Sequence, residues 1–187
     1  MIKGKLIDLQ PATLDDRRKV YDWCFHSEIT KSHAGQPDYP DVHIPSYDEF
    51  YNDYLDYFFI GQELNKGRGS MIMQNNTAIG FISYTSFHLK PHWAELDIWM
   101  CSEDNCGKGY GTDAIISLGN FICDTQNITK QIMRPALKNT RAITSYKKAG
   151  FEESNIPPTD YLLKEYITLY ADGDYGSGNT ALLLKTC

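Results

Sequence analysis

Three glycines alternate with larger residues in the segment Gly107-Lys108-Gly109-Tyr110-Gly111, which follows a strand-like stretch and precedes a helix-like one. Backbone N–H groups in such a turn can point toward one spot because no side chain stands in the way. The next helix adds the positive end of its dipole, Lys108 adds a charge and Thr112 a hydroxyl, and this combination suits a phosphate group. The turn alone is equally compatible with glycines that serve only tight packing, so other residues must distinguish a phosphate-binding turn from a structural one.

Two carboxylates lie on the strand-like stretch before this turn. Residues alternate along the segment 94–100, which places Glu95 and Asp97 on one face together with Trp99. A carboxylate that faces a cleft can attract a cation and accept a proton from an ammonium group. Asp97 and Glu95 are therefore candidate catalytic bases, and the alternative is a strand face that is simply solvated.

The glycine spacing differs from that of two common phosphate-binding motifs. It lacks the GK[ST] end of a P-loop, and its glycines are not spaced as in the dinucleotide fingerprint. The segment 107–112 instead resembles the acetyl-CoA loop of the GNAT acetyltransferases, Q/R-x-x-G-x-G/A. Further along, the segment 139–151 resembles the same family's motif N-x-x-A-x-x-x-Y-x-x-x-G-F. The two motifs in this order are highly specific, and the resemblance covers residues 94–153.

Within this family the chain is most similar to aminoglycoside 6′-N-acetyltransferases. These enzymes have an acid on a strand ten residues before the first loop glycine, and Asp97 lies at that distance from Gly107. The chain departs from the family at Cys106, where Gln or Arg is usual. The departure removes one side-chain contact to phosphate and leaves the backbone donors in place.

The resemblance implies acetyl-CoA as the acetyl donor and a set of roles around it. A backbone N–H near Trp99 or Met100 would stabilise the charge that develops on the thioester carbonyl. Tyr146 would protonate the leaving thiolate, although it also fits the apolar face of a helix. Asn139 would contact the pantetheine arm, although it can equally cap that helix. The residues expected to bind the cofactor are Trp99, Met100, Cys106, Gly107, Lys108, Gly109, Tyr110, Gly111, Thr112 and Asn139.

The elements that must position these residues follow from hydrophobic periodicity and from helix-start patterns near residues 13 and 46. Helices are expected from those two points and over 110–124 and 139–149. Strands are expected over 3–9, 69–75, 78–87, 94–100, 128–134, 161–170 and 180–185. Together these helices and strands predict one α+β domain, 1–187. Its expected architecture is a GNAT-like mixed, mostly antiparallel twisted sheet flanked by helices, with one parallel strand pair splayed at the cofactor site.

Composition narrows the class of protein. The formal charge of −6, without any run of Lys or Arg, argues against nucleic acid and favours cationic partners. No stretch is long and apolar enough to span a membrane and no secretory signal is visible, so a cytoplasmic location is expected. Five scattered cysteines without a CxxC pair indicate reduced thiols rather than a disulfide framework, and no metal site is expected.

The acceptor is expected to be a small cationic amine, with the 6′-amine of an aminoglycoside as the most specific version. Acids in the regions that would form its pocket are candidates for binding it, namely Asp53, Asp172 and Asp174, although each could be a surface charge. Two alternatives are a protein N-terminus or lysine as acceptor, and a non-catalytic sensor that only binds acyl-CoA. A monomer and a homodimer are both compatible with the sequence.

Overall fold

One mixed β-sheet runs through the computed structural model, which describes residues 1–30, 44–53 and 56–187. The strands are β1 (Ile2–Lys3), β2 (Asp8–Pro11), β3 (Gly67–Gln74), β4 (Thr77–Thr85), β5 (Trp93–Met100), β6 (Lys130–Met133), β7 (Glu152–Glu153) and β8 (Leu183–Thr186). Within the described residues their order in the sheet is β1-β2-β3-β4-β5-β6-β8-β7. Most of the predicted loop 29–45 lies outside the described residues.

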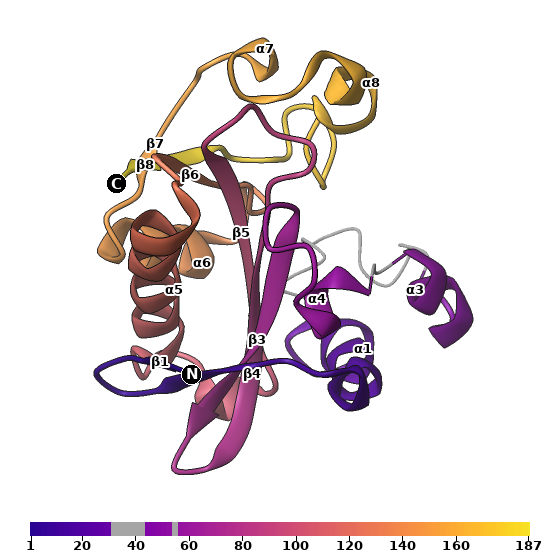
Figure 1. Cartoon of the computed structure of the whole chain (residues 1–187), viewed down its shortest axis with the longest axis vertical. Helices are drawn as coiled ribbons and strands as arrows, with labels where there is room; N and C mark the ends of the chain where they lie inside the picture. Colours follow the sequence, from indigo (N-terminus) through magenta and orange to yellow (C-terminus); the bar gives the residue numbers. More distant parts are fainter. Residues whose placement is uncertain (31–43, 54–55) are drawn as a thin grey trace.

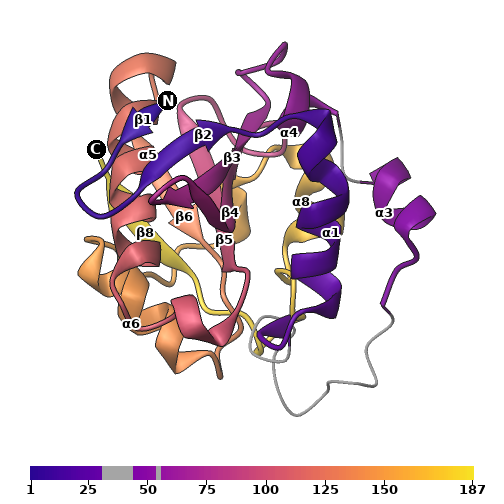
Figure 2. The ribbon, with the colours of Figure 1, turned by 90° about the horizontal axis from the view of Figure 1, so that it is seen from below.

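Helices cover both faces of this sheet (Figures 1 and 2). They are α1 (Arg17–His26), α3 (Tyr47–Asp53), α4 (Tyr57–Ile60), α5 (Tyr110–Gln126), α6 (Thr140–Lys148), α7 (Pro158–Tyr161) and α8 (Ile167–Tyr170), with single 3-10 turns η1 (Leu14–Asp16), η2 (Glu103–Asn105) and η3 (Lys164–Tyr166). Figure 1 places α5 and α6 on one side of the sheet, α1, α3 and α4 on the other, and α7 and α8 at one end. Among the described helices, none combines the length and the apolarity needed to cross a membrane.

The local signals explain several of these elements. The Ser46 hydroxyl accepts a hydrogen bond from the Glu49 amide, and the Glu49 carboxylate accepts one from the Ser46 amide, which confirms the predicted helix start. Asn75 and Asn76 both have positive φ and join β3 to β4 through a two-residue turn, as a tight hairpin requires. On α5, the apolar residues Ile115, Leu118 and Ile122 are buried.

Strand β5 is antiparallel to β4 along its length but pairs with β6 only at its start. The parallel register is Trp93 with Lys130, Ala94 with Gln131, and Glu95 with Ile132, and it ends there. Beyond Glu95 the strand continues toward Met100 with β4 on one side only. The predicted parallel pair with a splay is therefore confirmed.

Two strand predictions were wrong. Residues 161–170 form the end of α7, η3 and α8 rather than a strand, because Pro157 and Pro158 start a helical turn and the apolar side chains recur at helical spacing. The predicted first strand, 3–9, is two short strands joined by a turn in which the Gly4 amide bonds to the Ile7 carbonyl oxygen.

A disulfide joins Cys123 on α5 to Cys187, with 5.9 Å between their Cα atoms. The prediction of reduced thiols was therefore wrong for this pair, because residues separated by 64 positions meet only once β8 packs beside β6. Cys24, Cys101 and Cys106 are free.

The disulfide can be tested by counting thiols. When unfolded without a reductant, the chain should react with a maleimide at three cysteines, and after reduction at all five. Opening the 64-residue loop should lower the free energy of unfolding by up to about 4 kcal/mol, because the unfolded chain gains freedom. Five reactive thiols in unreduced protein would contradict the bond.

Candidate active site

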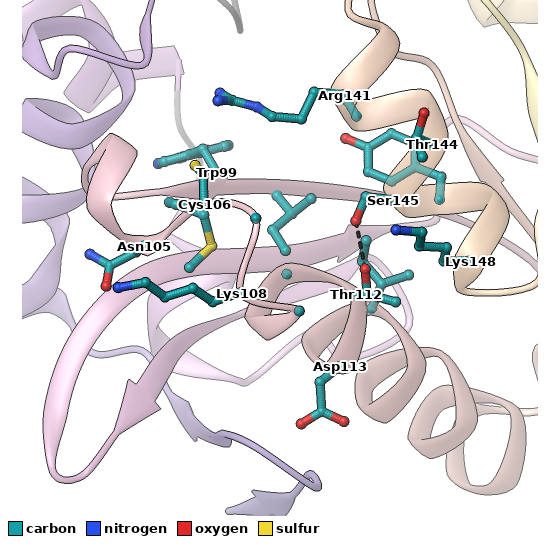
Figure 3. Close-up of a pocket in the computed structure, with 18 of the residues that line it drawn as sticks. Trp99, Asn105, Cys106, Lys108, Thr112, Asp113, Arg141, Thr144, Ser145 and Lys148 are labelled. Carbon is teal, nitrogen blue, oxygen red and sulfur yellow. Dashed lines mark hydrogen bonds between the residues drawn. The ribbon is translucent and has the colours of Figure 1, made fainter.

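The glycine turn forms one wall of a cleft of about 880 Å³. The opposite wall is α6, and the floor is the end of β5 (Figure 3). All the predicted cofactor-binding residues line this cleft except Tyr110, which begins α5 and packs against the hydrophobic core. Among the described cavities it is the one with room for a long ligand.

The turn has the backbone conformation that its glycines allow. Gly107 and Gly109 have φ values of 72° and 85°, which lie in the left-handed region that other residues rarely adopt. Gly109 is the N-cap of α5, so the first amides of that helix point toward the cleft. The carboxylate of Asp113 accepts hydrogen bonds from the Leu6 and Ile7 amides, which fixes α5 against the N-terminal hairpin.

Gly111 has a different role, because its φ is not in the left-handed region. A Cβ atom built there would lie 3.7 Å from Ile98 and 3.9 Å from Met100, which are ordinary contacts. Packing within the chain therefore does not require a glycine at this position. The family motif likewise has Gly or Ala at this position, so the fit to a pyrophosphate rests on the left-handed Gly107 and Gly109 and on the first amides of α5.

The α6 wall is fixed to the turn by specific bonds. The Asn139 side chain accepts a hydrogen bond from the Ala142 amide and so caps α6, as predicted. The Thr112 and Ser145 hydroxyls lie 2.8 Å apart and join α5 to α6 (Figure 3). Arg141 and Lys148 also line the cleft from α6, at helical spacing.

A second, smaller pocket opens where β5 and β6 diverge. Its volume is about 30 Å³, and Asp97 lines it two residues beyond the last β5–β6 pair. Tyr146 and Asn139 line both this pocket and the large cleft, so the two cavities meet at α6. An occupant of the small pocket would therefore lie next to the end of a ligand in the cleft.

The small pocket has the polarity of a site for a cation. The pKa of the Tyr146 phenol is raised by burial and by the negative charge of Asp97. Burial, and after it the charge of Asp97, also raise the pKa of the Tyr175 phenol and the pKa of the Cys24 thiol on α1. Asp97, which is exposed, is the negative charge that these three groups share.

Glu95 has a different environment from Asp97. Its carboxylate accepts hydrogen bonds from Arg134 Nε at 2.6 Å and Arg134 Nη2 at 3.0 Å, and lies 2.8 Å from His88 Nε2. Burial alone would raise its pKa, but Arg134 and then His88 lower it to about 2. A carboxylate held this way is a poor proton acceptor, so the geometry argues against Glu95 as the base.

The three predicted acceptor-binding acids lie in different places. Asp174 lines the small pocket and lies 3.4 Å from Arg134. Its side chain is 58% exposed yet lies in a recess, where desolvation and then Glu95 and Asp97 raise its pKa to about 7. Asp172 lines a neighbouring cavity of about 420 Å³ instead. Asp53 ends α3, and its side chain lies outside the described residues.

Several residues of the site were missed by the sequence predictions. Arg134, His88 and Tyr175 are isolated in the sequence and come to the site only through the fold. Arg141 was discoverable, because it lies on the same face of the predicted helix as Ser145 and Lys148.

The order of strands, the glycine turn and the splay can now be compared with known proteins. The model of the acetyltransferase (GNAT) domain matches residues 7–152, which is most of the chain. The chain belongs to the GNAT acetyltransferase family. It is therefore an N-acetyltransferase with acetyl-CoA as its acetyl donor.

Individual relatives are more distant. Aminoglycoside N(6′)-acetyltransferase type 1 from Klebsiella pneumoniae is 24% identical over 163 residues, which cover 82% of this chain and 77% of the relative. An aminoglycoside acetyltransferase solved with coenzyme A and kanamycin superposes with a TM-score of 0.69 at 19% identity, over 96% of this chain and 94% of the other. A ribosomal L7/L12 α-N-protein acetyltransferase solved with coenzyme A also has a TM-score of 0.69, at 12% identity, over 98% and 95%. The fold is thus common to acetyltransferases with very different acceptors.

The glycine turn can be tested through Gly107→Ala. We expect the variant to lose about 1 kcal/mol of stability, because alanine is strained at a φ of 72° although no atom lies within 4 Å of the added Cβ. It should bind CoA at least about 10-fold more weakly, since relief of that strain would turn the amides of the turn away from the pyrophosphate. Gly176→Ala is the matched control, because Gly176 has a φ of 80°, equally open surroundings and no place in the cleft. Calorimetric titration with CoA measures the difference, and equal affinity in the two variants would contradict a phosphate site at the turn.

The Glu95 ion pair should be visible in the pH dependence of stability. The pKa of Glu95 in the folded protein, about 2, lies below its ordinary value of 4.5. The ionised carboxylate therefore contributes its full stabilisation of the fold above pH 4.5, and this stabilisation is lost as the pH falls toward 2. That contribution is about 3 kcal/mol by linkage. Urea unfolding across this range should show a shallower loss of stability for Glu95→Gln than for wild type. Equal slopes would show that the ion pair does not form.

Proposed function

We propose that the enzyme transfers the acetyl group of acetyl-CoA to the primary amine of a small cationic acceptor, with Asp97 as the base. The observation that carries this proposal is the position of Asp97, in the small pocket that adjoins the cofactor cleft at Tyr146 and Asn139. An ammonium group must lose a proton before its nitrogen can attack a thioester carbonyl. A carboxylate within the pocket supplies both the attraction and the proton acceptor.

Two further groups are suited to the other half of the reaction. Tyr146 lies between the two cavities with its phenol protonated, so it can donate a hydrogen bond to the departing thiolate of CoA. The Cys101 amide bonds to Ile79 toward β4, so alternation along β5 turns the Met100 amide to the opposite side, toward the splay. That amide is placed to stabilise negative charge on the thioester oxygen.

The size and charge of the small pocket support a slender amine. The small pocket, at about 30 Å³, is far smaller than the cofactor cleft of about 880 Å³, so it suits one end of a slender acceptor rather than a bulky group. Asp97 provides negative charge there, and Asp174 adds to it only when deprotonated, since its pKa is raised to about 7, whereas the charge of Glu95 is balanced by Arg134. A primary amine on an unbranched carbon, within a molecule of several positive charges, matches this arrangement.

An aminoglycoside with a 6′-amine is the specific acceptor that we propose. The Klebsiella pneumoniae relative carries that activity in its name and covers most of this chain.

We propose in addition that residues 1–187 act as one domain, because Lys5 near one end of the chain lines the cleft and Tyr175 near the other lines the small pocket.

The decisive experiment follows thiol release from acetyl-CoA with a panel of acceptors. Aminoglycosides are offered as pairs that differ only in a 6′-amine or a 6′-hydroxyl, beside polyamines and peptides with a free N-terminus or lysine. Turnover of the 6′-amine member alone is the expected result. Turnover of peptides alone would favour a protein acceptor, and CoA binding without turnover of any amine would favour a sensor.

Asp97→Asn tests the base on whichever acceptor is turned over. We expect kcat to fall by about 100-fold or more, since the amide cannot accept the proton, while the affinity for CoA stays unchanged. Asp124→Asn, which changes an exposed acid near the far end of α5, is the matched control with wild-type kcat. A kcat for Asp97→Asn within a few-fold of wild type would overturn the assignment.

A further inference from the structure

We infer that Arg141 is a cofactor-binding residue, which provides from α6 the side-chain contact to the pyrophosphate that Cys106 does not provide from the glycine turn. The inference rests on the acetyl-CoA site described above and is independent of the acceptor.

The first support is the position of Arg141. Arg141 and Cys106 line the same cleft from opposite walls. In Figure 3 the Arg141 side chain extends from α6 toward the side of the cleft where Trp99 and Cys106 lie. The two groups are also coupled electrostatically: the pKa of the Cys106 thiol is raised by burial and lowered by the Arg141 guanidinium. The Arg141 guanidinium therefore lies close to position 106, where Gln or Arg would otherwise make the side-chain contact to phosphate.

The second support is the present partner of Arg141. Its guanidinium donates to both carboxylate oxygens of Glu103, which belongs to η2 just before the turn. This fork geometry is the one that also fits two oxygens of a phosphate. The carboxylate thus holds the guanidinium in an extended position next to the turn.

The third support is that this ion pair is replaceable. The side chains of Arg141 and Glu103 are 48% and 41% exposed, and exposed ion pairs contribute little to stability. A pyrophosphate beside the helix start offers more negative charge than one carboxylate does. Arg141 can therefore exchange Glu103 for the ligand with little loss to the fold.

The competing explanation is that Arg141 only braces α6 against η2. The two explanations differ in which ligand is affected. A brace would affect CoA and pantetheine alike, because it would shape the whole cleft. A contact to the pyrophosphate would affect CoA, which carries phosphates, and leave pantetheine, which has none, unchanged.

The test is calorimetric titration of the purified protein with CoA and with pantetheine, which needs no acceptor and so is independent of the proposed function. Arg141→Ala should weaken CoA binding by about 10-fold, the usual size of a lost charge-assisted hydrogen bond. Pantetheine affinity and the melting temperature should stay at the wild-type values. Lys147→Ala is the matched control, because Lys147 is also on α6 and forms a similarly exposed ion pair, with Glu153 of β7, but does not line the cleft.

The double variant Cys106→Arg with Arg141→Ala supplies the stricter test. If Arg141 replaces the contact missing at position 106, an arginine at 106 should return CoA affinity to within about threefold of wild type. Cys106→Gln serves the same purpose if circular dichroism shows that the arginine variant is not folded. Wild-type CoA affinity in Arg141→Ala, an equal loss for pantetheine, or no recovery with either substitution at position 106 would each overturn the inference.

Discussion

The site depends on one break in hydrogen bonding between two parallel strands. β5 and β6 pair as far as Glu95 and Ile132, and the ion pair of Glu95 with Arg134 lies at that point. A buried carboxylate and a buried guanidinium are each costly alone, so each fixes the other. The strands separate beyond this pair, and the opening places Asp97 between the cofactor cleft and the C-terminal segment.

The same pair explains why two acids so close in sequence have different chemistry. Glu95 is buried between Arg134 and His88, and its charge is stabilised by both. Asp97 is exposed at the splay, and the Ile98 amide donates a hydrogen bond to its carboxylate. Alternation along a strand predicts that both point to one face, but it does not predict which of them meets the arginine that directly follows the neighbouring strand β6.

The sequence predicted features set by neighbouring residues and failed to predict contacts between distant ones. The glycine turn, its helix and the cap at Asn139 are local features, so spacing and resemblance were sufficient to place them. The predictions failed where contacts are distant in sequence, as for Cys123 with Cys187. They also failed over residues 161–170, where an apolar segment is compatible with a strand or a helix until its packing partners, such as Trp93 for Tyr161, are known.

The division between local and distant residues also corresponds to a division of function. The cofactor cleft is built mainly from the end of β5, the turn, α5 and α6, which lie within the segment that carries both motifs. The small pocket adds Asp174 and Tyr175 from the segment before β8, beyond the second motif. Donor binding is therefore encoded in a compact stretch of sequence, whereas the small pocket also draws on a segment beyond the motifs. Neither the fold nor the motifs specify an acceptor, which has to be inferred from the pocket instead.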